Sequence, residues 1–453
     1  MHYRFIWITL ASLLLLAATA CNRPTPTPTA APTSTVASPT VAPTPTITPV
    51  PPPTATPTHE PTVEPTVEPT VANDPQSQIV ALLTASLQLT KPTTDSVGIE
   101  GVYAFPLATN DNHVYWLAYT YGIRNFDPIQ NHVIAIFEPS GNGWREVTRS
   151  ELAMRDDPAN PGLSPDYLGE GSVTQVQIEP THLWIQVEGG AGAHSGVYGL
   201  LSFDGTTLQE QANGFSSSPG LGRIEDLNGD GIAEVLLDAS DYYVFCYACG
   251  VRWVQWDIRR WDGEKLVPVT LQPLSGSAPA QVNDFNENLI ALAQAGLWKD
   301  ALAALETAHT FSYSEPALTW NLLYVQVNGE ARRAETESES AYPILSYIFY
   351  GDFDAAVARL RDVGADGIFI PESELIQGTV AQGWESALAD WIEKSVDPAL
   401  ALKSDLASAY FLRGWAAYLR NYTEAEAVPD IQKAAELAPD ETLYRKSLEF
   451  LTE

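Results

Sequence analysis

Positive charge is scarce in this chain of 453 residues, which has 24 Lys and Arg against 56 Asp and Glu and a formal net charge of −32 at pH 7. A polyanion repels the phosphates of nucleic acids and of anionic lipid surfaces, so neither is expected as a partner. Cations and basic proteins stay open as partners. A solubilising surface would carry the same charge, so the charge alone identifies no binding site.

Recognisable catalytic and zinc motifs are missing as well. The histidines show no pairing at the spacing of zinc ligands and stand at positions 2, 59, 113, 132, 182, 194 and 309. No serine lies in a nucleophile elbow, and no glycine-rich loop is arranged to cradle a phosphate. The sequence therefore predicts no enzyme of a motif-bearing class. A pair of catalytic acids brought together by folding stays open.

Long apolar runs are missing too, apart from one near the start. Residues 5–18 form an apolar run of 14, which has the size of a signal-peptide core and is too short to span a bilayer. The segment ATAC that follows, ending at Cys21, resembles the bacterial lipobox. The resemblance implies a signal peptide over 1–20, cleavage before Cys21 and a lipid anchor on that cysteine. The protein would then be held at the cell membrane, facing the extracytoplasmic side. An ordinary secretory signal is the alternative.

A stalk is expected over residues 21–75. Residues 22–72 contain 15 Pro and 15 Thr in 51 positions and end in three tandem Glu-Pro-Thr-Val copies. Such a composition buries little apolar surface and lacks many amide donors, so it stays extended and solvated. In the polyproline II conformation it would reach on the order of 150 Å.

Residues 76–278 are expected to form an antiparallel β domain, because aromatic-rich runs alternate with glycine turns there. A weak repeat is present in VIAIFEPSGNGWREVT, GLLSFDGTTLQEQA and WDIRRWDGEKLVPVT. Their leading aromatics are Phe137, Phe203 and Trp261, at intervals of 66 and 58 residues. This spacing indicates either propeller-like blades or a sandwich.

One motif in this region predicts a metal site. Asp226, Asn228, Asp230 and Glu234 occupy positions 1, 3, 5 and 9 of a D-x-N-x-D-G-x-x-E loop. Oxygen donors at alternate positions converge where a glycine allows a sharp turn, and the carbonyl of Ile232 can add a ligand. The loop predicts a structural calcium ion.

The twelfth position of that loop is Leu237, so it is not an EF-hand, which needs a bidentate Glu there. The loop and its strand-like flanks resemble the FG-GAP calcium loop of integrin-type propeller blades. An Asx-rich hairpin that binds nothing is the alternative, because Asn-Gly and Asp-Gly favour turns by themselves.

Cys246 and Cys249 form a C-x-x-C segment. An exported location favours a disulfide across a tight turn at the tip of a hairpin, with the two Cα atoms within roughly 6 Å. A redox-active pair and two free thiols are the alternatives.

Residues 279–453 are expected to be all-α, because their apolar residues recur three and four positions apart. Four segments place an aromatic three residues before an Ala, which would let two helices of a hairpin approach closely. These pairs are Trp298/Ala301, Phe353/Ala356, Trp384/Ala387 and Tyr422/Ala425. The pattern resembles degenerate tetratricopeptide repeats, which implies a concave surface that binds a protein or peptide. An irregular helical bundle is the alternative.

Together these features predict a membrane-anchored, surface-exposed lipoprotein that acts as a protein- or peptide-binding or assembly scaffold. The competing hypothesis is an extracytoplasmic hydrolase, directed at carbohydrate or peptide, with an acid pair in the β domain among Trp184, Trp253 and Trp256. A third possibility is an envelope-maintenance or nutrient-capture lipoprotein without a dedicated partner.

Overall fold

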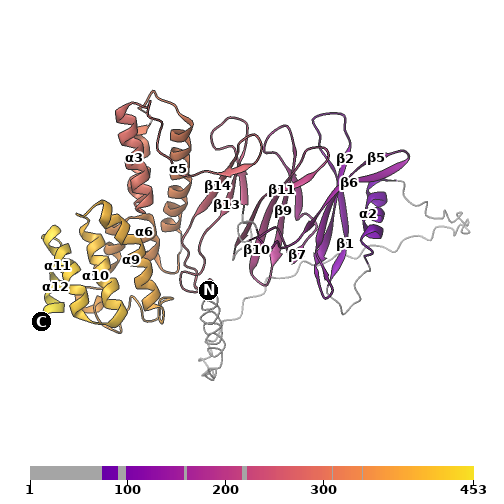
Figure 1. The fold of residues 1–453 in the computed structure, drawn as a ribbon. Helices are drawn as coiled ribbons and strands as arrows, with labels where there is room; N and C mark the ends of the chain where they lie inside the picture. Colours follow the sequence, from indigo (N-terminus) through magenta and orange to yellow (C-terminus); the bar gives the residue numbers. More distant parts are fainter. Residues whose placement is uncertain (1–73, 90–97, 158–160, 217–221, 309, 339) are drawn as a thin grey trace, which may run out of the picture. The chain divides into compact units, whose positions relative to one another are not determined.

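The computed structural model describes residues 74–89, 98–157, 161–216, 222–308, 310–338 and 340–453. An antiparallel β region comes first and is followed by an all-helical region (Figure 1), which is the order of fold classes expected from the sequence. The apolar run, Cys21 and the Pro/Thr tract lie outside the described residues. Among the described residues, no helix has both the length and the hydropathy that a membrane span needs.

Most strands of the β region belong to one large sheet, and the others form a four-stranded and a two-stranded sheet. In chain order the strands are β1 (Ile99–Leu107), β2 (Tyr115–Ile123), β3 (Asn125–Phe126), β4 (Ile129–Gln130), β5 (His132–Ser140), β6 (Gly143–Leu152), β7 (Tyr167–Leu168), β8 (Val173–Val176), β9 (Leu183–Ala191), β10 (Ser195–Phe203), β11 (Leu208–Ser216), β12 (Gly222–Glu225), β13 (Glu234–Asp238), β14 (Trp256–Trp261) and β15 (Leu266–Pro268).

Strand pairing divides this region into three successive antiparallel meanders of four strands. The first is β1-β2-β5-β6, the second is β8-β9-β10-β11 and the third is β12-β13-β14-β15. The short strand β7 pairs with both β2 and β9 and so joins the first two meanders into one sheet. The three repeated segments form the hairpins β5-β6, β10-β11 and β14-β15, which are the last two strands of each meander. The sequence repeat therefore marks a structural repeat.

Each meander is covered on both faces. Helix α2 (Pro75–Ser86) packs on the first meander through Ile79 and Leu83. One core lies between the first and second meanders, another between the second and third, and a smaller one between the third meander and helix α5 (Pro316–Glu337). Because side chains of a strand alternate between its faces, a strand buried on both sides is apolar throughout. In β13, for example, Val235 and Leu237 face the second meander while Leu236 faces α5.

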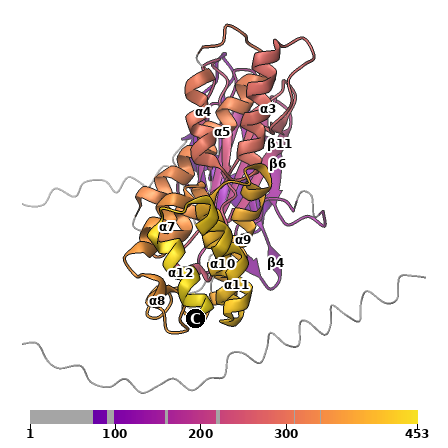
Figure 2. The same ribbon diagram turned by 90° about the vertical axis from the view of Figure 1, so that its left-hand side faces the viewer.

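The helical region consists of short helices that pack against their neighbours in sequence (Figures 1 and 2). Besides α5 they are α3 (Ala280–Gln294), α4 (Trp298–Ala308), α6 (Pro343–Tyr350), α7 (Phe353–Arg361), α8 (Ala365–Ile368), α9 (Glu385–Leu402), α10 (Ala407–Asn421), α11 (Glu424–Leu437) and α12 (Thr442–Thr452).

Three helix pairs, α3-α4, α6-α7 and α10-α11, turn through a residue in the left-handed conformation. These residues are Gly296, Gly351 and Tyr422, with φ of 72°, 77° and 51°. Five residues after each of them stands an alanine with no exposed surface: Ala301, Ala356 and Ala427. A fully buried alanine after a left-handed turn is therefore a repeated feature, and two of these alanines, Ala301 and Ala356, belong to the pattern found in the sequence.

The predicted register is wrong for the other two segments. Trp384 is 42% exposed, and Ala387 is only half-buried. Tyr422 forms the turn itself, so Ala425 is exposed and Ala427 takes the contact position two residues later. In α10-α11 the second small residue is Gly414, where a Cβ would lie 2.7 Å from the Ile431 side chain. The aromatic of the predicted pattern, Tyr422, is thus the turn residue of this hairpin and does not pack between its helices.

The long connection between β13 and β14 packs into the helical core. Val244, Phe245, Cys249 and Val251 are buried there with residues of α6 and α9. The indole nitrogen of Trp391 on α9 donates a hydrogen bond of 3.1 Å to the Val244 carbonyl oxygen. The residues expected to belong to the β domain alone therefore share a core with the helices.

Candidate functional site

The loop between β12 and β13 holds the predicted metal ligands in a tight series of turns. The Asp226 carboxylate accepts the amide hydrogens of Gly229 and Gly231 at 2.8 and 2.9 Å. The side-chain oxygens of Asn228 and Asp230 accept amides two residues further on, each at 2.8 Å. Gly229 and Gly231 have φ of 76° and 85°, which glycine adopts without steric cost. These bonds hold three alternate oxygen-bearing side chains in one loop.

Glu234 differs from the other predicted ligands because it is buried, with 1% of its surface exposed. Its Oε2 accepts the Leu227 amide hydrogen at 2.9 Å. Burial raises the pKa of the Glu234 carboxyl to about 7, with the charges of Asp230 and Asp226 adding to the effect and the Leu227 hydrogen bond opposing it. The carboxylates of this loop are therefore close enough to repel one another.

Within the described residues, no three His, Cys, Asp or Glu side chains gather in a metal-binding arrangement. Asp226, Asp230 and Glu234 are three ligands of those types, so the loop does not bring their carboxylates together into such an arrangement. The loop nevertheless fits a divalent cation in its donor chemistry, because carboxylate, amide and carbonyl oxygens are what calcium binds.

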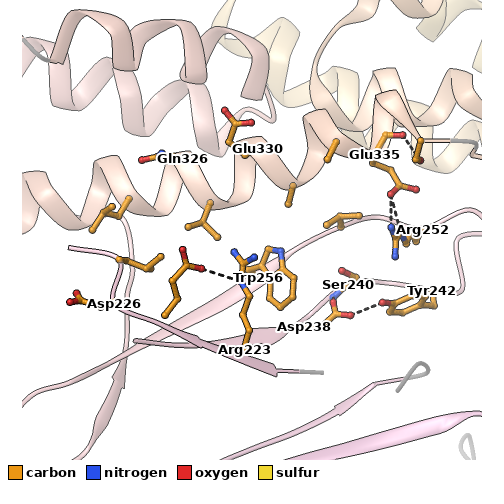
Figure 3. Close-up of a pocket in the computed structure, with 18 residues that line it drawn as sticks. Arg223, Asp226, Asp238, Ser240, Tyr242, Arg252, Trp256, Gln326, Glu330 and Glu335 are labelled. Carbon is orange, nitrogen blue, oxygen red and sulfur yellow. Dashed lines mark hydrogen bonds and ion pairs between the residues drawn. The ribbon is translucent and has the colours of Figure 1, made fainter. Parts of the chain in front are cut away.

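A groove lies beside this loop, between the third meander and α5, with a volume of about 630 Å³ (Figure 3). We call it the sheet groove. Five carboxylates and two guanidinium groups line it, which leaves a local excess of three negative charges. The charged lining residues are Glu225, Asp226, Asp238, Glu330, Glu335, Arg223 and Arg252.

Both arginines of the sheet groove are held by neighbours. Arg252 donates hydrogen bonds of 3.0 and 2.8 Å to Oε2 of Glu335, which is buried and lies 83 positions away on α5. The Arg223 guanidinium lies 5.0 Å from the centre of the Trp256 ring. Tyr242 donates a hydrogen bond of 2.5 Å to Asp238, and burial, with this bond and the Asp238 charge, raises the pKa of the tyrosine to about 12. The two cations are therefore engaged, and the carboxylates dominate the lining.

A second groove, the helix groove, lies between α4 and α5 and has a volume of about 720 Å³. Its lining is mixed: it includes the apolar Leu302, Leu305 and Leu322, and two charges of each sign from Lys299, Arg333, Glu306 and Glu330. The two grooves meet on α5, because Leu323, Gln326 and Glu330 line both. The sequence pattern did not single out α5, because its residues carry no aromatic-Ala signature. In the sequence, only the general helical periodicity of residues 279–453 covered this helix, which is 22 residues long in the structure.

The three tryptophans proposed to surround an acid pair have different neighbours. Trp184 is fully buried and donates a hydrogen bond of 3.0 Å to Glu179. Trp256 lines the sheet groove, whereas Trp253 packs on Trp391 of α9. Burial tends to raise the pKa of Glu179, but hydrogen bonds from Thr181, His182 and Trp184 outweigh it and leave that pKa below its usual value. Glu179 is therefore suited to remain ionised and structural.

Cys246 and Cys249 are joined by a disulfide across the short helical turn η2 (Tyr247–Cys249), with their Cα atoms 5.1 Å apart. Cys249 is buried in the helical core. The turn therefore does not lie at a free hairpin tip, because its chain segment packs under α6 and α9. The third cysteine, Cys21, lies outside the described residues.

No protein-family model matches this chain, and no curated protein has a sequence significantly similar to it. The function has to be inferred from the residues and their geometry.

Proposed function

We propose that this protein is an extracytoplasmic, lipid-anchored scaffold that binds a basic segment of a partner protein along α5. The observation that supports this best is the meeting of the sheet groove and the helix groove along Leu323, Gln326 and Glu330. Together they offer an acidic stretch followed by one in which leucines lie among two charges of each sign. A segment with Lys or Arg beside apolar residues is complementary to these two neighbouring grooves.

The finer architecture belongs to the same proposal. We propose that the three four-stranded meanders form an open, propeller-like stack, and the shared cores between successive meanders support this. The helix pairs with left-handed turns support a degenerate tetratricopeptide-like array. In this proposal α5 covers one face of the third meander and forms part of the binding surface.

Calcium is proposed as a structural ion. Asp226, Asn228, Asp230 and Glu234 would hold it through their side chains, and Ile232 through its carbonyl oxygen. Calcium would neutralise the repulsion that contributes to the raised pKa of Glu234 and so stiffen the loop at the end of the sheet groove.

The groove is tested with a fluorescent peptide of alternating Lys and Leu, whose binding to the full mature chain is followed by anisotropy. Gln326 is exposed where the grooves meet, so Gln326→Arg adds a like charge to the path of the peptide. We expect this change to weaken binding about tenfold, on the order of 1.4 kcal/mol.

The matched control is Gln432→Arg, an exposed position on α11, which changes the net charge by the same amount. It should leave the affinity within about twofold. Equal losses in the two variants would mean that the peptide senses only the overall charge, and the groove proposal would be abandoned.

The anchor is tested separately in cells. Replacing Cys21 by Ser removes the thiol that would carry the lipid, so the protein should lose labelling by a fatty-acid probe and move from the detergent phase to the aqueous phase. Cys246→Ser is the control and should remain labelled. Labelling that persists in Cys21→Ser would rule out this anchor.

A further inference from the structure

Arg332, on α5, is a buried cation without an acidic partner. Only 1% of its surface is exposed, and among the described residues its electrostatic neighbours include no carboxylate. Its Nε has no hydrogen-bond partner there either. Buried charges are ordinarily paired because desolvation is costly. Burial lowers the pKa of Arg332 to about 9, so the group still carries its charge at neutral pH.

Two tryptophans and two neutral oxygens hold the guanidinium in place. Its carbon lies 4.9 Å from the ring centre of Trp253 and 4.3 Å from that of Trp298. Its terminal nitrogens donate hydrogen bonds to the Asn328 carbonyl oxygen at 3.2 Å and to the Gln255 amide oxygen at 3.1 Å. Cation–π contacts offset part of the desolvation cost. None of these neighbours supplies a negative charge.

The guanidinium lines a cavity of about 250 Å³, which we call the Arg332 cavity. A second cation, the exposed Lys394 of α9, lies at the same cavity, with its ammonium 4.1 Å from the ring centre of Trp391 and 5.5 Å from that of Trp253. Two positive groups with no acid among the described residues that line the cavity contrast with the acidic composition of the whole chain.

We propose that the Arg332 cavity binds a small organic carboxylate, with its charged end on the Arg332 guanidinium and its apolar body between the tryptophans. A carboxylate would accept charge-assisted hydrogen bonds from the guanidinium. Lys394 would attract the anion from solvent.

The walls favour an organic acid over an inorganic oxyanion. Besides the three tryptophans, the lining includes Leu271, Ile348 and Phe349, with Gln255, Gln294, Tyr324 and Ser395 as its uncharged polar side chains. An apolar body therefore finds more contacts there than the outer oxygens of phosphate do. The volume suits a ligand of about ten heavy atoms, below the usual range for drug-sized molecules. Benzoate has that size and an apolar ring, so it serves as the probe.

The experiment titrates the full mature chain with sodium benzoate and, in parallel, with benzyl alcohol and inorganic phosphate. Sodium chloride keeps the ionic strength constant, which removes general screening. Binding is followed by tryptophan fluorescence and by calorimetry. We expect saturable benzoate binding that is at least about tenfold tighter than that of benzyl alcohol or phosphate.

Arg332→Met should bring the benzoate-to-benzyl-alcohol affinity ratio close to one. Arg333→Met, at the neighbouring exposed residue that pairs with Glu330, should leave it unchanged. If Arg332→Met does not fold, Lys394→Gln gives a second test at an exposed position, with an expected loss of about threefold. No saturable binding of benzoate, or an affinity equal to that of benzyl alcohol in the wild-type chain, would overturn the proposal and leave Arg332 as a structural cation.

Discussion

Replacing Gly351 by Ala is expected to lower the free energy of unfolding by about 3–4 kcal/mol. Gly351 has a φ of 77°, where an L-residue with a Cβ is strained by roughly 1–2 kcal/mol. The added Cβ would also lie 2.6 Å from the Gly296 carbonyl oxygen and 2.9 Å from the Leu297 Cα. Both are backbone atoms, so relieving the overlap means separating the α3-α4 and α6-α7 turns. Urea unfolding followed by circular dichroism measures the change.

Gly296→Ala is the matched control, because Gly296 has a φ of 72° in the equivalent turn and nothing lies within 4 Å of its added Cβ. It should lower the free energy of unfolding only by the cost of a Cβ in the left-handed backbone conformation, about 1 kcal/mol. Equal losses in the two variants would contradict direct packing of one hairpin turn on the next.

Glu234→Gln is expected to stabilise the calcium-free protein at pH 8 by on the order of 2–3 kcal/mol. The folded-state pKa of Glu234, about 7, is above its usual value of 4.5. A raised pKa contributes stability below pH 4.5, and that contribution is lost as the pH rises to about 7. Gln keeps the acceptor for the Leu227 amide but carries no charge. The two proteins should therefore have similar stability at pH 4 and diverge as the pH rises from about 4.5 to about 7, as measured by urea unfolding in chelator.

Calcium should reverse the order of stability, so that the wild-type chain becomes more stable than Glu234→Gln. If Glu234 is a ligand, millimolar calcium stabilises the wild-type chain at pH 8, and that gain falls as the pH drops below 7 and the carboxyl takes up a proton. Glu225→Gln is the control, because Glu225 lies opposite Glu234 in the β12-β13 register and is exposed. A calcium response that is the same in all three proteins would remove Glu234 from the ligand set. No response in any of them would remove the site.

The fold classes could be predicted because their signals are local. The strand-turn-strand repeats around Phe137, Phe203 and Trp261 depend on neighbouring residues, and each forms a hairpin in the structure. The number of strands in each meander was harder to predict from the sequence. Strands such as β8 and β12 have four residues each and pair with strands formed later in the chain, which leaves little periodicity to recognise.

The helical register shows why a pattern of residue types can mislead. Trp384 stands where the pattern expects an aromatic packed between two helices, yet 42% of its surface is exposed. Tyr422 stands at the same position of its segment but forms the turn. What the helix pairs share is a left-handed residue followed five positions later by a buried small side chain. A backbone conformation of that kind is not visible in the residue type when the turn residue is a tyrosine rather than a glycine.

Features that depend on neighbouring residues can be read from the amino-acid order alone: the acidic charge, the oxygen-rich loop from Asp226 to Glu234, the hairpin repeats and the amphipathic helices. Which distant residues meet becomes known only from the folded chain. Arg252 reaches Glu335, and Arg332 lies between Trp253 and Trp298. The physical reason is that packing of the β13-β14 connection against α5 and α9 buries these groups together. Whether a charge is buried therefore depends on residues that are far away in the sequence.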